Sequence, residues 1–545
     1  MSTRLNLAAI FLILSQCLCL NMVHAETQSS ETTVSQSSQQ SLDAIQQFVR
    51  GDFATRRALL NQWPASVEQL DQLAEFVEKD QLYTDSSGNT YILEAEDKLV
   101  SYPDKKAVET WPSDLSQITL VNTLNKALTF GLAKKKLNSD EASQRLDAID
   151  ILENNLSELD AQAINQMYLN EKNNTVKARF AQLKARLDYQ SEDVLTKIEA
   201  AKVLKDSNRP DVLALVENEL AQPNLHPDLK AALVDARSSI KTRIQASEWT
   251  GHVFSGLSTA SILLLAALGL AITYGLLGVI NMAHGELIMI GAYTTYVVQS
   301  FFKSHFSGLV DWYLIAAIPA AFIVSAAIGM LIERTVIRPL YGRQLETLLA
   351  TFGVSLILMQ VVRMIFGAQN VEVSNISWLS GGISITPSLM LPYNRIAIIV
   401  FTVAVLLLLV YLLNKTRFGL FVRAVTQNRQ MARAVGIRSS RIDMMAFGLG
   451  SGLAGLAGCA LAQVGNVGPD LGQNYIIDAF LVVVVGGVGQ VWGAVLAALG
   501  LGVSGTVLEI GMGAVLSKII LLVLVILFIQ KRPQGLFAIK GRFVE

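Results

Sequence analysis

Apolar residues are concentrated in the second half of the chain, where they form runs separated by short polar stretches. A helix that crosses a bilayer needs roughly 20 such residues. Runs of this kind occupy residues 256–280, 284–300, 313–333, 347–367, 392–413, 443–464, 478–508 and 514–530. The run at 478–508 exceeds one crossing and contains closely spaced glycines, so we expect it to turn back there. The pattern predicts an all-α polytopic membrane protein with eight or nine crossings.

The first half of the chain follows a different pattern. Between residues 42 and 248, apolar positions recur mostly every three or four residues, which is typical of amphipathic helices. Two β-like runs within residues 82–93 flank a Ser-Gly-Asn turn and indicate one hairpin. Residues 227–240 indicate a separate short helix before the first membrane run. We therefore expect a mostly helical soluble domain at 42–248 and a transmembrane domain at 249–545.

The N-terminal residues have the features of a targeting segment and a tether. Residues 1–25 combine Arg4, an apolar core and a small-residue cleavage pattern, as a secretory signal peptide does. Residues 26–41 are nearly all Ser, Gln and Thr, which predicts a flexible linker. Cleavage would place the domain at 42–248 in the periplasm. The alternative is an uncleaved first membrane span.

The polar stretch at residues 415–442 decides the expected orientation. It contains seven basic residues and no acidic residue. Such a loop stays on the cytoplasmic side of a bacterial inner membrane. Counting crossings from this loop places the domain at 42–248 outside the cytoplasm and the C-terminus inside. Basic residues at 334–343, and in the tail at Lys540 and Arg542, agree with this count.

Within this stretch, apolar residues recur at helical spacing. One helix face would carry Phe421, Ala424, Val425, Asn428, Met431, Ala432 and Val435, and Gly436 would end the helix. A rigid amphipathic helix at the membrane border can dock in a groove of a soluble partner. Two alternatives remain open: a solvated loop that only sets topology, or a helix that lies on anionic lipid.

Two segments interrupt the apolar runs with glycines and polar residues. The first has Asn281, His284, Gly285 and Glu286, and the second has Gly486, Gly487, Gly489 and Gly493. Interrupted segments in the two halves of a membrane domain often line a transporter's substrate pathway. The first segment equally fits a turn at the cytoplasmic ends of two spans. Asn281 would then cap a helix end, and Glu286 would lie in the first turn of the next helix.

Charge divides the chain at the same boundary. Residues 26–248 carry 25 Lys and Arg against 35 Asp and Glu, whereas residues 249–545 carry 18 against 10. No basic patch is large enough to favour nucleic acid as a partner. The three cysteines, Cys17, Cys19 and Cys459, predict neither a disulfide in the mature chain nor a Cys metal site. We find no nucleophile–base pair and no metal-ligand cluster, so no catalytic and no metal-binding residues are predicted.

Four motifs in order carry a family resemblance: INMAHGELIMIGAY at 280–293, RAVTQNRQMARAVGI at 423–437, GGVGQVWGA at 486–494 and RPQGLF at 532–537. Together they resemble the permease subunits of branched-chain amino acid ABC importers. The resemblance implies a transport subunit of the inner membrane that binds no cofactor, because separate subunits hydrolyse ATP. It also implies a second permease, two ATP-binding subunits, a periplasmic substrate-binding protein and membrane lipid as partners.

The resemblance further implies that residues 423–437 form the coupling helix that docks on an ATP-binding subunit. The role carries over to Arg423, Ala424, Asn428, Arg429, Ala432, Arg433, Gly436 and Ile437. The domain at 42–248 departs from those permeases and looks like the urea-transporter permeases of the same family (the UrtB type), which favours urea as the substrate. Branched-chain amino acids or short amides are the alternative. A membrane receptor with a periplasmic sensor domain is the second alternative.

Overall fold

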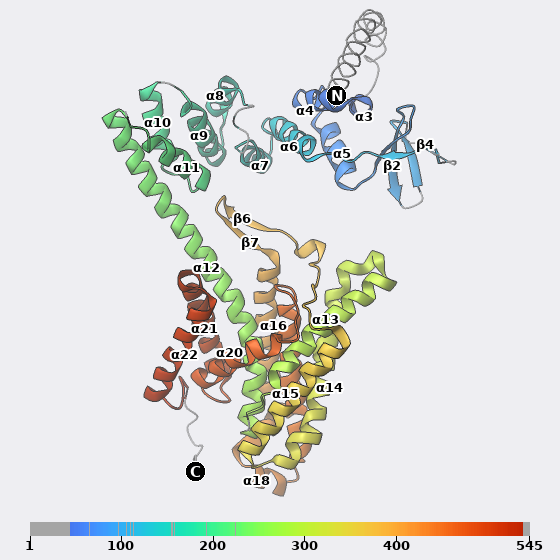
Figure 1. Cartoon of the computed structure of the whole chain (residues 1–545), viewed down its shortest axis with the longest axis vertical. Coiled ribbons are helices and arrows are strands. Elements are labelled where there is room, and N and C mark those ends of the chain that lie inside the picture. Colours follow the sequence, from blue (N-terminus) through green and yellow to red (C-terminus); the bar gives the residue numbers. More distant parts are fainter. Residues whose placement is uncertain are drawn as a thin grey trace, which may run out of the picture. The chain divides into compact units, whose positions relative to one another are not determined.

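The computed structural model (Figure 1) describes residues 44–537 apart from positions 65, 96–97, 105, 109–110, 113, 154–155, 157–158, 192, 224 and 279. The expected signal peptide at 1–25, the linker at 26–41 and the basic tail residues Lys540 and Arg542 lie outside the described residues. Contacts divide the chain into two compact units. The N-terminal unit comprises residues up to 207 and residues 212–240. The membrane unit comprises residues 208–211 and those from 241 onward.

Helices and one antiparallel sheet make up the N-terminal unit. The helices are α3 (Ala44–Arg50), α4 (Phe53–Asn61), α5 (Val67–Glu78), α6 (Asn122–Lys136), α7 (Ala142–Leu152), α8 (Ala161–Asn170), α9 (Asn174–Asp188), α10 (Val194–Leu204) and α11 (Pro210–Leu220). The sheet has the order β4-β3-β2-β1-β5, built from β1 (Leu82–Thr84), β2 (Thr90–Ala95), β3 (Lys98–Tyr102), β4 (Lys106–Ala107) and β5 (Ser116–Gln117). Leu70 and Leu82 belong to one buried core, and Ile149 and Phe180 belong to a second.

Strands β1 and β2 confirm the expected hairpin, with Tyr83 opposite Tyr91. Asp85 holds the turn, because its Oδ1 accepts hydrogen bonds from the backbone N–H groups of Ser87 (3.0 Å) and Asn89 (2.8 Å). The sequence pattern does not indicate β3, β4 or β5. Strands β4 and β5 have two residues each, which is too short for alternation of apolar and polar positions to be visible.

Helix α12 (Pro227–Leu277) runs without interruption through the boundary between the two units. The expectation of a separate short helix at 227–240 is therefore wrong. Residues 241–255 contain no proline, and Gly251 is the one strongly unfavourable helix residue among them. A single glycine costs too little to end a helix that continues into an apolar run.

The membrane unit continues with α13 (His284–His305), η3 (Ser307–Trp312), α14 (Tyr313–Ile332), η4 (Glu333–Ile337), η5 (Arg338–Leu340), α15 (Gln344–Phe366), η6 (Ser377–Leu379), β6 (Gly382–Thr386), β7 (Leu389–Pro392), α16 (Tyr393–Lys415), α17 (Arg417–Gln427), α18 (Arg429–Ala434), α19 (Ser439–Leu461), α20 (Leu471–Gly486), α21 (Val491–Met512) and α22 (Ala514–Lys531). Within the described residues, seven helices are long and apolar enough to cross a membrane: α12, α14, α15, α16, α19, α21 and α22. Helix α13 has 22 residues and α20 has 16, and neither is among the seven. The seven helices confirm the all-α polytopic fold, with fewer candidate crossings in the described residues than the eight or nine expected.

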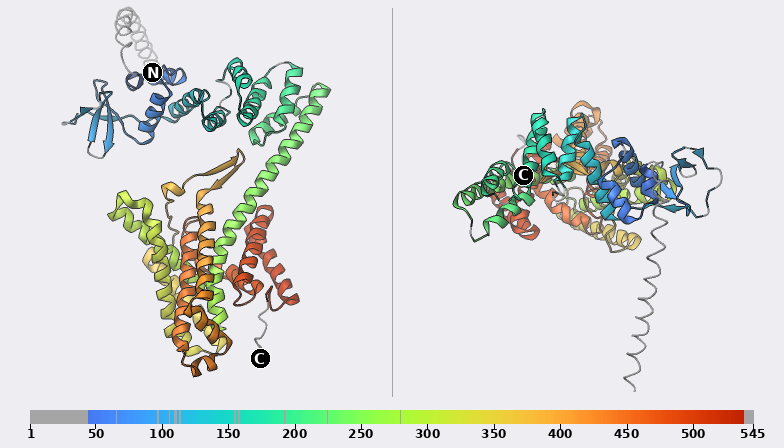
Figure 2. Two further views of the ribbon diagram at one scale, coloured as in Figure 1. Left: turned by 180° about the vertical axis from the view of Figure 1, so that it is seen from behind. Right: turned by 90° about the horizontal axis from the view of Figure 1, so that it is seen from above.

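Two details of the membrane unit concern the chain's turns. The run expected to reverse within 478–508 does so between α20 and α21, at residues 487–490. The β6–β7 hairpin, which the pattern does not indicate, directly precedes α16 (Figure 2). Helices α21 and α22 pack together, and α21 also packs along α12, where Gly502 contacts Ala260.

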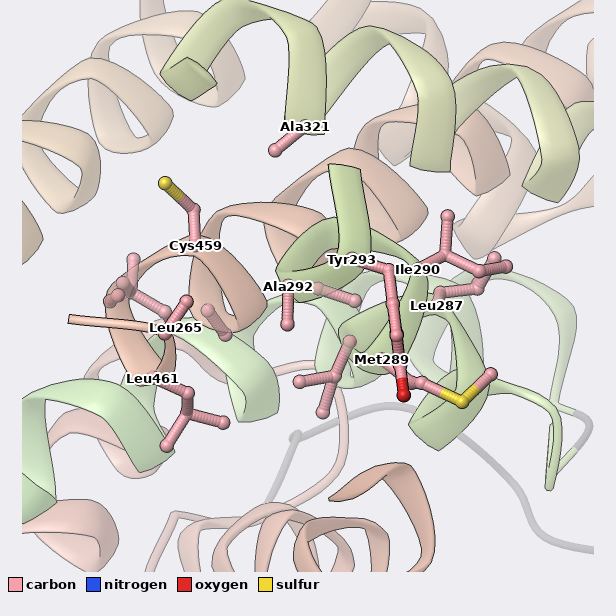
Figure 3. Packing of buried hydrophobic residues seen from close by; sticks show 14 of the residues in the cluster. Leu265, Leu287, Met289, Ile290, Ala292, Tyr293, Ala321, Cys459 and Leu461 are labelled. Carbon is pink, nitrogen blue, oxygen red and sulfur yellow. The ribbon is translucent and has the colours of Figure 1, made fainter. Parts of the chain in front are cut away.

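Helix α19 is the packing centre of the membrane unit. Its most apolar stretch is 83% buried, whereas the corresponding stretch of α15 is 17% buried. Helices α13 and α14 lie against it, and Figure 3 shows Ala292 and Tyr293 of α13 in one buried cluster with Cys459 and Leu461 of α19. Glycines permit this approach: a Cβ atom on Gly458 would overlap the backbone oxygen of Ile288.

Replacing Gly458 by alanine should destabilise the membrane unit, because overpacking of this kind typically costs about 1–3 kcal/mol. The matched control is Gly353→Ala in α15, where no atom lies within 4 Å of the added methyl group. We expect thermal unfolding of the purified chain in detergent at a lower temperature for Gly458→Ala and not for Gly353→Ala. Equal unfolding temperatures for G458A and the wild type would contradict the close packing.

Candidate functional site

The connection between α12 and α13 folds back into the bundle. After Leu277 the chain leaves the helix, and α13 begins at His284. The Nε2 atom of His284 lies 3.0 Å from the backbone oxygen of Ala266, which is eleven residues, or roughly 16 Å, before the end of α12. Helix α13 therefore begins beside the apolar C-terminal part of α12, well before the end of that helix. Irregular backbone at this depth is tolerated only where it is buried in protein or lines a cavity.

The turn expected at the cytoplasmic ends of two spans shows the predicted local contacts but does not lie at the end of α12. The Asn281 Oδ1 atom accepts a hydrogen bond from the backbone N–H of Ala283 (3.1 Å), and Glu286 lies in the first turn of α13. However, Asn281, His284 and Glu286 are at most 2% exposed. A turn at a membrane surface would leave such side chains in water, so the buried position favours the pathway interpretation.

Helix α20 begins against the first turn of α13. A Cβ atom on Gly285 would lie 2.5 Å from the backbone oxygen of Gly472, so the two backbones are in direct contact. The N-termini of both helices therefore meet inside the membrane unit. Each N-terminus carries a partial positive charge, and half-helices that meet in this way form the ion and substrate sites of many transporters.

Buried polar atoms without a partner surround this meeting point. Ser355 Oγ donates a hydrogen bond to Glu286 Oε1 (2.9 Å), whereas Glu286 Oε2 has no hydrogen-bond partner. The same is true of Asn281 Nδ2, His284 Nδ1 and the Tyr293 hydroxyl. An unsatisfied buried polar group costs about 1–3 kcal/mol, and each such group needs an explanation. A small ligand with its own donors and acceptors would satisfy this set.

An apolar cavity of about 190 Å³ adjoins the same segment. Its walls include Leu270 of α12, Leu348 of α15 and Phe480 of α20, and Asn281 reaches into it from the connection.

The Arg363 guanidinium donates a hydrogen bond to the Asp470 carboxylate (2.5 Å) just before α20. Sequence reasoning missed Ser355 and Arg363, because isolated polar residues within apolar runs form no motif, and Asp470, which lies between two runs. Tyr293 ends the motif at 280–293, but no role was predicted for it.

The second glycine group lies elsewhere. Gly486 and Gly493 contact each other at the turn between α20 and α21, and Gly487 and Gly489 there have φ of +98° and +77°. This turn is separated from the site by the 16 residues of α20, roughly 24 Å. The structure therefore does not bring the two glycine groups into one site.

The C-terminal motif packs on this glycine turn. The backbone N–H of Leu536 donates to the backbone oxygen of Val485 (2.8 Å), and Gly487 contacts the backbone of Phe537. The motifs at 486–494 and 532–537 therefore pack against each other. This contact joins the two motifs at one end of the membrane unit.

The basic loop folds as two short helices, α17 and α18, which meet at a sharp bend. We call the whole segment, residues 416–438, the elbow. Asn428 lies at the bend and caps α18, because its Oδ1 accepts a hydrogen bond from the backbone N–H of Met431 (2.9 Å). The expectation of one helix with a shared apolar face is therefore wrong. Val422 and Val425 are buried, while Met431 and Val435 are 61% and 70% exposed. Gly436 ends α18 with φ of +90°, as expected.

All three arginines expected to dock form hydrogen bonds within the chain, and Arg423 is held on α16, where its Nη1 donates to the backbone oxygen of Leu413 (2.5 Å). The other two contact α19. Arg429 forms a two-bond ion pair with the buried carboxylate of Asp443 on α19 (2.6 and 3.1 Å). Its guanidinium also lies over the ring of Tyr341, 5.5 Å from the centroid. Arg433 Nε donates to Ser439 Oγ (2.8 Å). These contacts attach the elbow to α19.

Tyr341 extends this attachment to the end of α14. Its hydroxyl donates to Glu333 Oε1 (2.8 Å), and Arg338 pairs with the same carboxylate (3.0 Å). Burial raises the pKa of Tyr341, with the nearby Asp443 carboxylate as a second cause. The hydroxyl therefore stays protonated and keeps donating its hydrogen bond. The remaining predicted residues, Arg423, Ala424, Ala432 and Ile437, lie on the same elbow, and Ala432 is buried.

Comparisons with known proteins cover the membrane unit. The family model described as "Branched-chain amino acid transport system / permease component" matches residues 252–529. BraD of Pseudomonas aeruginosa, a high-affinity branched-chain amino acid transport system permease protein, is 32% identical over 291 residues, which is 52% of this chain and 94% of that protein. LivH of Escherichia coli K12, with the same description, is 28% identical over 292 residues, or 52% and 94% of the two chains.

A further relative agrees with this assignment. The probable branched-chain amino acid transport permease protein LivH of Methanocaldococcus jannaschii is 28% identical, with 51% of this chain and 89% of that protein covered. No solved structure matches the chain. Since the family model covers more than half of its residues, and BraD is matched over nearly its whole length, the chain belongs to the family of branched-chain amino acid transport system permease components.

Proposed function

We propose that the chain forms the transmembrane pathway of an ABC importer that is driven by separate ATP-binding subunits. Its relatives are permease proteins, so the chain is a transport component of a multi-pass type and not an enzyme. One observation carries the proposal of a pathway: two helix N-termini meet inside the membrane unit among buried polar atoms that lack partners. A second permease, two ATP-binding subunits and a periplasmic binding protein complete the proposed assembly.

We propose further that the elbow faces the cytoplasm and the N-terminal unit the periplasm. The basic residues of the elbow support this orientation. Exposed apolar side chains, among them Leu420, Met431 and Val435, supply the contacts for an ATP-binding subunit. Charged residues that sequence reasoning assigned to docking, above all Arg429, contribute indirectly by fixing the elbow on α19.

Branched-chain amino acids are the substrates that the relatives support. Every relative named above is a branched-chain amino acid permease protein, which favours this alternative over the urea interpretation of the sequence. The apolar cavity beside Asn281 would suit an aliphatic side chain, because its walls are leucine, isoleucine, methionine and phenylalanine.

Urea is the second candidate, and two observations favour it. The membrane unit matches BraD over 94% of the length of BraD. The unmatched part of BraD is too short to contain a counterpart of the domain at 42–248. In addition, the unsatisfied atoms include an amide donor on Asn281 and a carboxylate acceptor on Glu286. A planar neutral amide could pair with both without bringing a charge into the membrane unit.

Uptake of labelled leucine and labelled urea should separate the two candidates. In a strain that lacks this chain, we expect the uptake of one solute to be lost and to return when the chain is restored. Loss of leucine uptake alone supports the amino-acid function, and loss of urea uptake alone supports the urea function. Normal uptake of both solutes would refute each of them.

Glu286→Gln should reduce uptake of the transported solute roughly tenfold or more, because hydrogen bonds to a charged group are worth about 1.5–3 kcal/mol. The amide is nearly isosteric and can still accept the hydrogen bond from Ser355, so the fold should survive. The control is Glu372→Gln, since Glu372 is exposed between α15 and η6. Wild-type uptake by E286Q at normal membrane levels would remove Glu286 from the pathway.

Aspartate at both Met431 and Val435 should abolish coupling by placing charges on the apolar surface of the elbow. We expect uptake to fall roughly tenfold or more, as for loss of interface anchors worth about 2 kcal/mol, with the chain still inserted in the membrane. Leu309→Asp is the control, because Leu309 is similarly exposed (51%) in η3, at the other end of α14 from the elbow attachment. Undiminished uptake in the double variant would exclude docking through these side chains.

A further inference from the structure

A second cavity, of about 230 Å³, lies between α12, α20, α21 and α22. Its lining includes three charged side chains, Asp478 of α20, Glu509 of α21 and Lys518 of α22. All three belong to apolar helices, and two of these helices are long enough to cross a membrane. Charged residues in such segments are rare and costly, and they commonly mark a functional site.

The three charged side chains form one ion pair and leave one carboxylate unpaired. Lys518 Nζ lies 3.5 Å from Asp478 Oδ2, which is longer than a well-formed charged hydrogen bond. Glu509 forms no ion pair within 4 Å in the part of the chain that the structure describes. Asp478 alone pairs with Lys518, and the exposed Glu509 can accept a further positive charge. The Lys518 side chain is 58% exposed, which leaves its other N–H donors open to an anion.

The rest of the lining is mostly apolar, with uncharged polar groups on Thr259, Tyr475, Thr506 and Ser517. Leu263, Leu481, Leu501 and Leu521 come from four different helices, and Gly502 and Gly505 leave space between them. A ligand that fits this cavity would combine a positive group, a neighbouring negative group and an aliphatic body. The aliphatic body would remove apolar surface from water or compete with lipid tails for it.

We propose that this cavity binds a zwitterion in which a primary ammonium group and an anionic group are close together on an aliphatic body. The ammonium would lie between Asp478 and Glu509, and the anionic group would pair with Lys518. Two sources offer this chemistry: a free aliphatic amino acid, or an aminophospholipid whose ammonium and phosphate form its headgroup. The first source rests on the proposed amino-acid function, whereas the second does not.

The experiment uses the full-length chain, purified in detergent and reconstituted into nanodiscs. One arm measures binding of labelled L-leucine, with leucinol, which lacks the carboxylate, as the comparison ligand. The other arm compares melting temperatures in nanodiscs that contain phosphatidylethanolamine or phosphatidylcholine, whose quaternary ammonium has no hydrogen-bond donor. The variants are Asp478→Asn and Lys518→Gln. Ser504→Ala, which changes a polar residue of α21 outside the cavity, is the matched control.

We expect one of the two ligands to bind the wild type and Ser504→Ala equally well. The same ligand should bind Asp478→Asn and Lys518→Gln roughly tenfold more weakly or not at all. Leucine binding with rejection of leucinol identifies the amino acid, and stabilisation specific to phosphatidylethanolamine identifies the lipid. Equal behaviour of all four proteins toward both ligands would overturn the proposal. So would a lower melting temperature of D478N without any ligand effect, because the Asp–Lys pair would then only join α20 to α22.

The outcome is separable from that of the proposed function. If neither leucine binding nor phosphatidylethanolamine stabilisation depends on Asp478 and Lys518, but cells take up leucine normally through the chain, the zwitterion site is refuted and the amino-acid importer stands. If cells that contain the chain take up no leucine, but its phosphatidylethanolamine stabilisation depends on Asp478, the amino-acid function fails and the site stands.

Discussion

The membrane unit depends on a backbone contact between two glycines, Gly285 at the start of α13 and Gly472 at the start of α20. Any side chain at either position would push the helices apart. Because the contact is so close, the partial positive charges of two helix N-termini converge beside Glu286. This convergence, together with the hydrogen bond from Ser355, is the physical reason why a carboxylate that is 1% exposed can be accommodated there.

Helix α12 connects this site to the elbow. Its apolar part contacts His284 at Ala266 and Gly269, and its last turn, at Leu276, lines a cavity that Arg429 and Val425 of the elbow also line. These contacts are about ten residues apart, or roughly 15 Å along one helix. A tilt or shift of α12 would therefore alter the polar site and the elbow at the same time. The structure thus offers a short mechanical route between the proposed substrate site and the proposed docking surface.

The elbow shows how one set of residues can serve two purposes. Its arginines supply the positive charge that holds the loop on one side of a membrane. Arg429 also closes a network with Asp443, Tyr341 and Glu333 that fastens α18 to the ends of α14 and α19. Since removing one partner of a buried ion pair is far more costly than removing an exposed charge, substitution of Arg429 would test the attachment of the elbow rather than its docking.

Much of the architecture was determined by the sequence alone. Long apolar runs form helices in a membrane, because the bilayer core has no water and each backbone polar group must be hydrogen-bonded within the protein. Local chemistry likewise indicated the β1–β2 hairpin, the glycine turn after α20 and the end of the elbow at Gly436. These features depend on neighbours in sequence, so periodicity and turn residues were sufficient to find them.

Tertiary structure decided which residues meet. The sequence did not show that α13 begins beside Ala266 of α12, that Gly472 contacts Gly285, or that Ser355 reaches Glu286, because these contacts join residues 18 or more positions apart. Nor did helical spacing identify the elbow's buried face, since the Asn428 side chain formed a cap and broke the expected helix in two. A pattern along the chain reports which residues prefer burial, whereas the partner of each buried polar group depends on how the helices are packed.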